Sequence, residues 1–175
     1  MILTAYLASV LGKTAQIPLT TYLTFEQSYS GVDGDSASMA ECCAIISAIS
    51  EQALRQDIAI TGSMNQFGEA QPIGGVNEKI EGFFDVCKIK GRTSDQGVII
   101  PASNMANLML RKDIVDAVAQ GEFHIWAITH VTQAMELLLG KTAGSLSQTA
   151  TPSQGQYSPR AFSALPSKSS PHLDL

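Results

Sequence analysis

The sequence lacks the features that mark proteins that bind nucleic acids or cross membranes. It has no run rich in lysine and arginine, and its formal net charge is −5 with a pI near 5.1. A partner of nucleic acids or of an anionic membrane surface needs clustered positive charge, so neither partner is expected. The sequence also has no uninterrupted apolar stretch of about 18 residues, which a membrane-spanning helix would need.

Cysteine is scarce as well. The three cysteines are Cys42, Cys43 and Cys87, they form no C-x-x-C motif, and ligands at the spacing of a zinc site are missing. Cys42 and Cys43 lie within an apolar pattern, where cysteines pack as small hydrophobic side chains. This usage is typical of a reducing compartment, so we expect a cytoplasmic protein without a metal site.

A nucleotide-binding loop is also missing. Gly12-Lys13-Thr14 and Gly140-Lys141-Thr142 each resemble the end of a P-loop. The pattern requires a further glycine upstream, and Leu7 and Met135 occupy the two positions where it would stand. We therefore expect no cofactor in this chain.

The composition changes near residue 140. Residues 1–140 alternate strand-like and helix-like runs, which predicts one α/β or α+β domain with mixed sheets packed against helices. Residues 141–175 are dominated by serine, threonine, proline, glutamine and alanine, without apolar periodicity. Such a segment buries too little surface to offset the entropy of ordering, so we expect a disordered tail.

Hydrophobic periodicity and breaker residues predict the elements within the domain. Apolar steps of three and four residues indicate helices, and short runs rich in β-branched and aromatic residues indicate strands. The expected helices span 1–11, 38–54, 76–87, 105–119 and 131–139. The expected strands span 18–27, 57–64, 69–73, 97–101 and 123–128, with a hairpin turn at 65–68 and an extended loop over 88–97.

An acidic, glycine-bearing turn precedes the helix expected over 38–54. It reads Asp33-Gly34-Asp35-Ser36-Ala37-Ser38, which brings Ser36 close to the first turn of that helix. The unpaired N–H groups and the positive end of the dipole there can hold a developing oxyanion, which suits a nucleophilic serine. Serine and aspartate are also ordinary N-cap residues, and on this segment alone capping is the simpler interpretation.

A lysine stands about one turn into the helix expected over 76–87. Most helical lysines are solvated surface charges, and Lys79 taken alone fits that description. An uncharged Lys79 could instead take the proton of Ser36 and return it to a leaving amine, as in Ser–Lys variants of the catalytic triad. This hypothesis requires burial of Lys79, because desolvation penalises the ammonium form.

Together these segments resemble the Lon protease family. Residues 33–38 match the family's D-G-[PD]-S-A-[GS] box, and residues 72–79 (PIGGVNEK) match its P-[IV]-G-G-x-x-x-K box. Residues 58–63 (IAITGS) and 98–104 (VIIPASN) resemble two further segments of the family. The separation of serine and lysine also suits the family, and the ordered set is far more specific than any single box.

The resemblance implies a Lon proteolytic-domain fold, with Ser36 as nucleophile and Lys79 as general base and acid of a peptidase. It implies that Thr61 helps to orient the lysine amine, with a plain strand residue as the alternative. Asp35 would tune the site by charge or pair with the resting lysine, with a turn residue as the alternative. The implied partners are unfolded polypeptides, copies of the chain in a homo-hexamer, and an AAA+ ATPase module of the parent chain that would bind ATP.

The chain also departs from the family's pattern. The family usually has more chain before the serine than is present here, so we expect a fragment of a larger protein with some N-terminal strands absent. Glu41 stands where the family more often has an aliphatic residue. The acidic serine box resembles the archaeal, membrane-associated branch or a Lon-like bacterial relative.

Two other functions stay open. A catalytically silent Lon-like domain could serve as an oligomerisation or binding module, although an intact Ser36 and Lys79 argue against it. A Ser–His hydrolase could use His124 or His130. A histidine on a strand or at a helix cap is usually structural, however, and the sequence has no G-x-S-x-G box.

Overall fold

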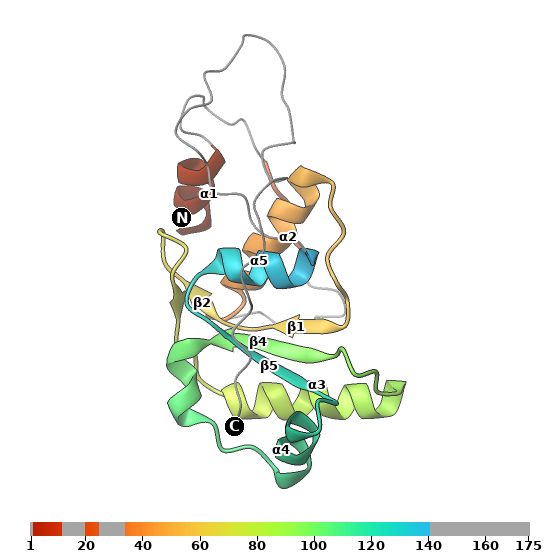
Figure 1. Ribbon diagram of the computed structural model, residues 1–175. Helices are drawn as coiled ribbons and strands as arrows, with labels where there is room; N and C mark the ends of the chain where they lie inside the picture. The colour runs from red at the N-terminus through yellow and green to blue at the C-terminus, as the bar shows by residue number, and fades with distance from the viewer. Residues whose placement is uncertain (1, 12–19, 25–33, 141–175) are drawn as a thin grey trace.

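The computed structural model describes residues 2–11, 20–24 and 34–140. They form three layers, with a central sheet between two groups of helices (Figure 1). The predicted class, α/β with mixed sheets and helices, is confirmed. The tail predicted over 141–175 lies outside the described residues. So does half of the strand predicted over 18–27, and the described half, residues 20–24, forms no strand.

The central sheet is parallel and has three strands in the order β1-β4-β5. They are β1 (Ile58–Ile60), β4 (Gly97–Pro101) and β5 (His124–Ile128). All five residues of β4 are buried, as expected for a central strand that helices cover on both faces. Proline lacks an N–H for further pairing, which suits Pro101 as the last residue of the strand.

A small antiparallel hairpin follows β1. It pairs β2 (Ser63–Met64) with β3 (Ala70–Gln71), which confirms the predicted hairpin. The single strand predicted over 57–64 is wrong, because this segment is divided into β1 and β2, which belong to different sheets. Asn65 shapes the turn, because its Oδ1 accepts the N–H groups of Phe67 and Glu69 at 3.0 and 3.1 Å. The side chain thus satisfies two N–H groups of the turn, as asparagine often does in turns.

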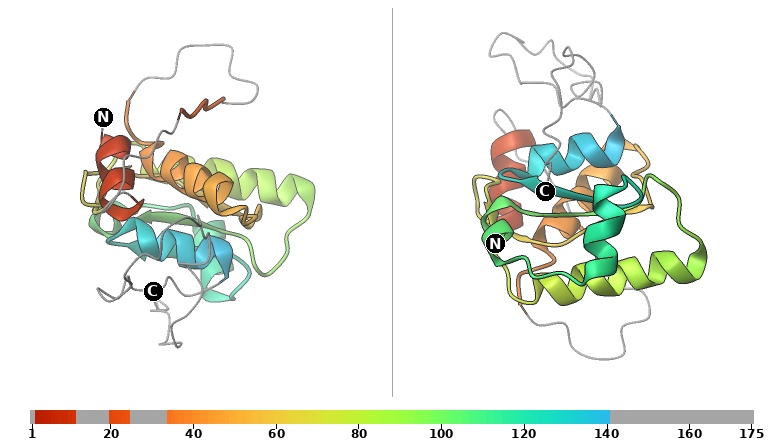
Figure 2. Two further views of the ribbon diagram at one scale, coloured as in Figure 1. Left: turned by 90° about the horizontal axis from the view of Figure 1, so that it is seen from above. Right: turned by 60° about the horizontal axis from the view of Figure 1, so that its bottom comes forward.

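The helices are divided between the two faces of the sheet. Figures 1 and 2 agree that α1, α2 and α5 lie on one side and that α3 and α4 lie on the other. Ile99 of β4 packs into the first group, whereas Val98 and Ile100 pack into the second. The helical elements are α1 (Ile2–Leu11), α2 (Ser38–Ser50), α3 (Val76–Lys90), the 3-10 helix η1 (Ala102–Asn107), α4 (Lys112–Ala119) and α5 (Val131–Leu139).

The helix predicted over 105–119 is wrong in its first half, where the structure has the end of η1 and an irregular connection to α4. Side chains of α3 hold this connection. Asn77 Oδ1 accepts the Met109 N–H at 2.9 Å, and Glu81 Oε1 accepts the Arg111 N–H at 3.1 Å. These N–H groups are bonded to α3 and are therefore not available for a helical ladder.

Two other boundaries differ from the prediction. The helix expected over 38–54 ends at Ser50, because Glu51 adopts a left-handed conformation with φ 53° and closes the helix. The loop expected over 88–97 is confined to 91–96, because α3 extends further than its periodicity predicted. The predicted helix over 131–139 is confirmed.

Gly62 has no room for a side chain. A Cβ at this position would collide with the Met39 side chain and lie 2.9 Å from Pro101 Cγ. The backbone of Gly62 also joins two elements. Its N–H donates to the Ser36 carbonyl at 2.9 Å, and its carbonyl accepts the Met39 N–H at 3.3 Å. Gly62 thus ties the end of β1 to the start of α2.

We expect Gly62→Ala to lower the free energy of unfolding by about 2 kcal/mol, the usual cost of overpacking a filled site. Gly82→Ala is the matched control, because Gly82 lies inside α3 and an added Cβ meets nothing within 4 Å. That control should be neutral or stabilising by up to about 1 kcal/mol. Chemical denaturation measures both, and equal effects of the two variants would contradict the close packing at Gly62.

Exposed charges of α3 and α4 gather around Arg111. Its guanidinium donates to Asp85 at 2.6 and 2.9 Å and to Asp113 at 3.2 Å, and Lys88 also pairs with Asp113 at 3.2 Å. The hydrogen bonds from Arg111 hold the pKa of Asp113 down to about 2 and lower the pKa of Asp85. The folded state therefore binds protons at these carboxylates less readily than the unfolded chain does.

This difference gives the stability a pH dependence with a definite sign. The contribution of Asp113 is complete above the ordinary carboxyl pKa of about 4 and is lost as the pH falls towards about 2. We expect the free energy of unfolding of Arg111→Gln to decrease less than that of the wild-type chain as the pH falls from about 4 to about 2, as measured by urea denaturation at each pH. Arg92→Gln removes the Arg92–Glu122 ion pair and the contact of Arg92 with the Phe84 ring, and it serves as the control because neither Asp85 nor Asp113 is a partner of Arg92. If the free energy of unfolding of Arg111→Gln falls with pH as steeply as that of the wild-type chain, the expected effect is contradicted.

Candidate active site

Ser36 lies in the turn that leads into α2, as its sequence context predicted. Backbone contacts with the end of β1 hold this turn in place. The Ser36 carbonyl accepts the Gly62 N–H at 2.9 Å and the Thr61 hydroxyl at 3.4 Å. On the other side of the turn, Ser38 Oγ accepts the Met64 N–H at 3.1 Å. The serine turn is therefore fixed against the sheet and the hairpin.

Lys79 lies in the first turn of α3 and reaches Ser36. The helix starts after Gly75, whose φ of 67° is in the left-handed region that favours glycine. The Lys79 N–H donates to the Gly75 carbonyl at 3.1 Å, so the lysine backbone is already part of the helix. Lys79 Nζ lies 2.9 Å from Ser36 Oγ and 3.2 Å from Thr61 Oγ1.

Thr61 completes the group. It extends the pairing of β1 with β4, because its N–H donates to the Ile99 carbonyl at 3.1 Å. Its hydroxyl donates to the Ser36 carbonyl, which leaves an oxygen lone pair for an N–H of Lys79. The structure thus brings Ser36, Lys79 and Thr61 together from three separate elements.

Asp35 points to a different partner. Its Oδ2 accepts a hydrogen bond of 2.6 Å from the hydroxyl of Ser63, which is buried at the start of β2. A pair with Lys79 was one expectation for Asp35, and it is not among the ion pairs that the described residues form. The contact with Ser63 is that of a turn residue that anchors the segment before Ser36.

The expected burial of Lys79 is wrong for this chain. The side chain is exposed, and Ser36 and Thr61 are half-buried. The reason is the rotation of α3 about its own axis. In this rotation Val76 and Ile80 face the core, and Lys79 lies next to them on the exposed side of the helix. Next to the lysine, the start of α3 borders an open hollow of about 420 Å³ that residues 72–78 line together with two asparagines of η1.

Two backbone N–H groups beside the serine are available for a ligand. Within the described part of the chain, the N–H groups of Ser36 and Ala37 donate to no protein atom. Those of Ser38 and Met39 are bonded to backbone carbonyls. The start of a helix leaves such donors unpaired, and they can hold negative charge on a nearby oxygen.

Three residues that shape the site were not assigned a role from the sequence. Gly62 holds the Ser36 carbonyl, Ser63 holds Asp35, and Asn104 holds the backbone of Ile73 before α3. All three lie in segments that match family boxes. Their partners lie 26 to 31 residues away along the chain, so only the fold reveals the contacts.

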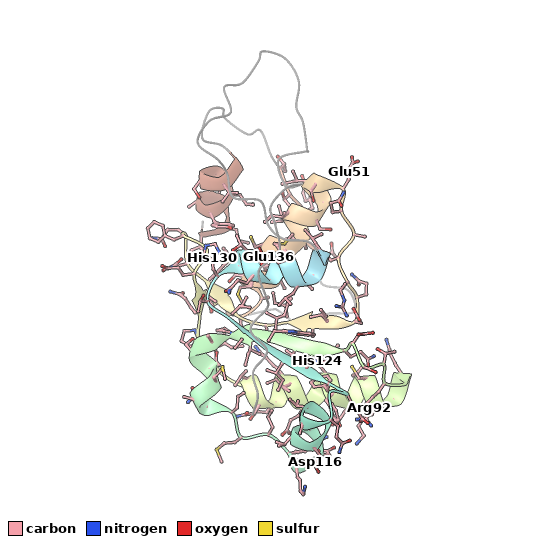
Figure 3. The ribbon with its side chains drawn as sticks, in the orientation of Figure 1. Glu51, Arg92, Asp116, His124, His130 and Glu136 are labelled. Carbon is pink, nitrogen blue, oxygen red and sulfur yellow. The ribbon has the colours of Figure 1, made fainter. Side chains whose placement is uncertain are left out.

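His124 and His130 do not contact Ser36, whose side chain has Lys79 as its partner among the described residues. His130 is the N-cap residue that precedes α5 (Figure 3), and its Nδ1 accepts the Thr132 N–H at 3.2 Å. His124 stacks on Trp126 at a ring distance of 5.3 Å. These contacts are structural, and the Ser–His alternative has no support in the geometry.

The described residues include neither a group of three potential metal ligands nor a helix with the length and apolar character that crossing a bilayer requires. The cysteines are free and buried. Burial raises the pKa of Cys42 and of Cys43 to about 12, so both remain thiols at neutral pH. They pack as small hydrophobic side chains, as predicted.

Comparison with known proteins identifies relatives of this chain. It is 58% identical over 139 residues to a protein of Escherichia coli (strain K12) described as a homolog of Lon protease, a match that covers 79% of this chain and 24% of the relative. A protein of Haemophilus influenzae with the same description is 48% identical over 141 residues, or 81% of this chain and 24% of the relative. An archaeal Lon protease of Methanocaldococcus jannaschii is 49% identical over 88 residues, or 50% of this chain and 12% of the relative.

The chain therefore spans about a quarter of the length of its bacterial relatives. The family model of the Lon protease (S16) C-terminal proteolytic domain matches residues 27–141, a segment that contains the serine turn, the lysine helix and the whole sheet. The match covers more than half of the chain, and on this ground the chain belongs to the Lon protease family as a C-terminal proteolytic domain.

Proposed function

We propose that this chain hydrolyses peptide bonds, with Ser36 as nucleophile and Lys79 as general base and acid. The observation that carries the proposal is the 2.9 Å separation of Lys79 Nζ and Ser36 Oγ. At that distance a base can take a proton directly from a hydroxyl group. Membership of the Lon family supports the same reaction class.

The reaction proceeds through an acyl-enzyme. Ser36 Oγ attacks the scissile carbonyl carbon while its proton passes to the uncharged Lys79 amine, and the N–H groups of Ser36 and Ala37 hold the oxyanion. The C–N bond then breaks, Lys79 returns the proton to the leaving amine, and the acyl group remains on Ser36 as an ester. Water attacks the ester with Lys79 as base, and the hydroxyl of Ser36 is restored.

Thr61 and Asp35 support these steps without bond changes of their own. Thr61 accepts one N–H of the amine, so the nitrogen lone pair faces Ser36. Asp35 holds the serine turn through Ser63. Because Lys79 is exposed in this chain, we infer that the bound polypeptide or a neighbouring copy covers the amine and excludes water during the reaction.

The proposed substrates are unfolded polypeptides, as membership of the Lon family suggests. An AAA+ ATPase module of the parent protein would unfold and deliver them, and ATP would bind to that module and not to this chain. Six copies would form a ring in the cytoplasm with their sites facing an inner chamber. The archaeal relatives that carry the name Lon protease support the assignment of this chain as a protease.

We expect Ser36→Ala and Lys79→Ala each to reduce the hydrolysis of a short fluorogenic peptide by about a thousandfold or more, because nucleophile and base act as a unit. Lys90→Ala is the matched control, since Lys90 is an exposed lysine of the same helix. Its activity should equal that of the wild-type chain. Full activity of Ser36→Ala would show that Ser36 is not the nucleophile, and an inactive wild-type chain would favour a catalytically silent domain that serves in oligomerisation or binding.

We expect Thr61→Val to lower kcat about tenfold, because the lysine amine loses the oxygen that orients it. Thr61→Ser keeps the hydroxyl group and should retain most of the activity. Steady-state kinetics of the two variants separate the hydroxyl from the methyl group. Equal losses in both would show that the shape of the side chain matters and the oxygen does not.

A further inference from the structure

One buried side chain holds the segment that precedes the lysine helix. Asn104 in η1 is 3% exposed, and it is one of two buried polar residues in the part of the chain that the structure describes. Its Nδ2 donates to the Ile73 carbonyl at 2.8 Å, and its Oδ1 accepts the Ile73 N–H at 3.0 Å. A single carboxamide thus satisfies both backbone groups of a residue 31 positions away.

Ile73 lies where the direction of α3 is set. It is followed by Gly74 and by Gly75, which is the N-cap of the helix, and the Lys79 N–H donates to the carbonyl of Gly75. Two consecutive glycines give this connection little stiffness of its own. The position of the first helical turn, and of the amine that it carries, therefore depends on the anchor at Ile73.

The first turn of α3 has a second link to the same region. Asn77 Nδ2 donates to the Asn107 carbonyl at 3.1 Å, and its Oδ1 accepts the Met109 N–H. The segment η1 directly follows β4, whose Ile99 carbonyl accepts the Thr61 N–H. One continuous stretch of chain thus holds both the threonine and the start of the lysine helix.

We propose that Asn104 is a positioning residue of the active site, which keeps Lys79 Nζ within hydrogen-bonding distance of Ser36 Oγ by holding Ile73. The inference rests on the proposed function. Loss of the carboxamide leaves two backbone groups of the half-buried Ile73 without their partner, which favours a shift of the segment towards water. A misplacement of reacting groups by about 1 Å can cost about a hundredfold in rate.

The test compares two asparagines of η1. Asn104→Ala removes the side chain, and Asn104→Asp keeps its shape but places an acceptor where Ile73 needs a donor. Asn107→Ala and Asn107→Asp make the same changes three residues away at an exposed side chain that borders the same hollow. For each variant, kcat and KM for a fluorogenic peptide are measured at pH 8 on the full chain, per folded molecule as judged by near-UV circular dichroism.

We expect kcat per folded molecule to fall about tenfold or more in both Asn104 variants with KM nearly unchanged, and to stay within about twofold in both Asn107 variants. A purely structural role of Asn104 would reduce the folded fraction and leave kcat per folded molecule intact, which would overturn the inference. An equal loss in Asn107→Asp would overturn it as well. If Asn104→Ala does not fold, Asn104→Asp decides the outcome.

Ser36→Ala separates this inference from the proposed function. If the wild-type chain is inactive, or if Ser36→Ala keeps the wild-type activity, the proposed function fails and the inference fails with it. If Ser36→Ala is inactive while the Asn104 variants keep their full kcat per folded molecule, the proposed function stands and only the role of Asn104 is refuted.

Discussion

The pairing of β1 with β4 is the constraint on which the whole site depends. It places Thr61 at the end of β1, where its N–H is bound to the Ile99 carbonyl. The next residue, Gly62, has no space for a side chain and binds the carbonyl of Ser36. The serine turn and Thr61 are therefore both held by the paired strands β1 and β4, without a long or flexible connection between them.

The lysine reaches the site by a different route. It lies on α3, on the opposite face of the sheet from α2 (Figure 1). Its Nζ meets Ser36 Oγ next to Thr61, the residue that follows β1. The helix packs into the core through Val76, Ile80 and Phe84, and this stripe fixes its rotation about its own axis. In this orientation the side chain of Lys79 is exposed to solvent. The chain by itself therefore places the amine at a distance suited to proton transfer from Ser36, but it excludes little water from the amine.

Much of the fold could be predicted because its signals are local. The buried strand ended by Pro101, the turn built on Asn65 and the helix closed by Gly140 each depend on residues that are close together in the sequence. The break between η1 and α4 could not be predicted. It arises because Asn77 and Glu81, on another helix, bind N–H groups that a helix would have used.

The candidate site likewise has features that could be predicted from the sequence and features that could not. The boxes around Ser36 and Lys79 are short and ordered, so both residues could be selected from sequence alone. The burial of the lysine was predicted wrongly, because it depends on how α3 is rotated in the core and not on its own neighbours. The anchors at Ser63 and Asn104 were missed, since a serine in a strand and an asparagine after a proline have many possible partners until the fold selects one.

The central claim is that an amine at position 79 activates the hydroxyl at position 36. The most direct test is the reaction of the chain with a fluorophosphonate that labels activated serines, followed by intact-mass and peptide mass spectrometry. The claim predicts one adduct per chain on Ser36, formed at least about a hundredfold more slowly in Lys79→Met. Equal labelling rates in the two proteins, or an adduct on a different serine, would contradict it.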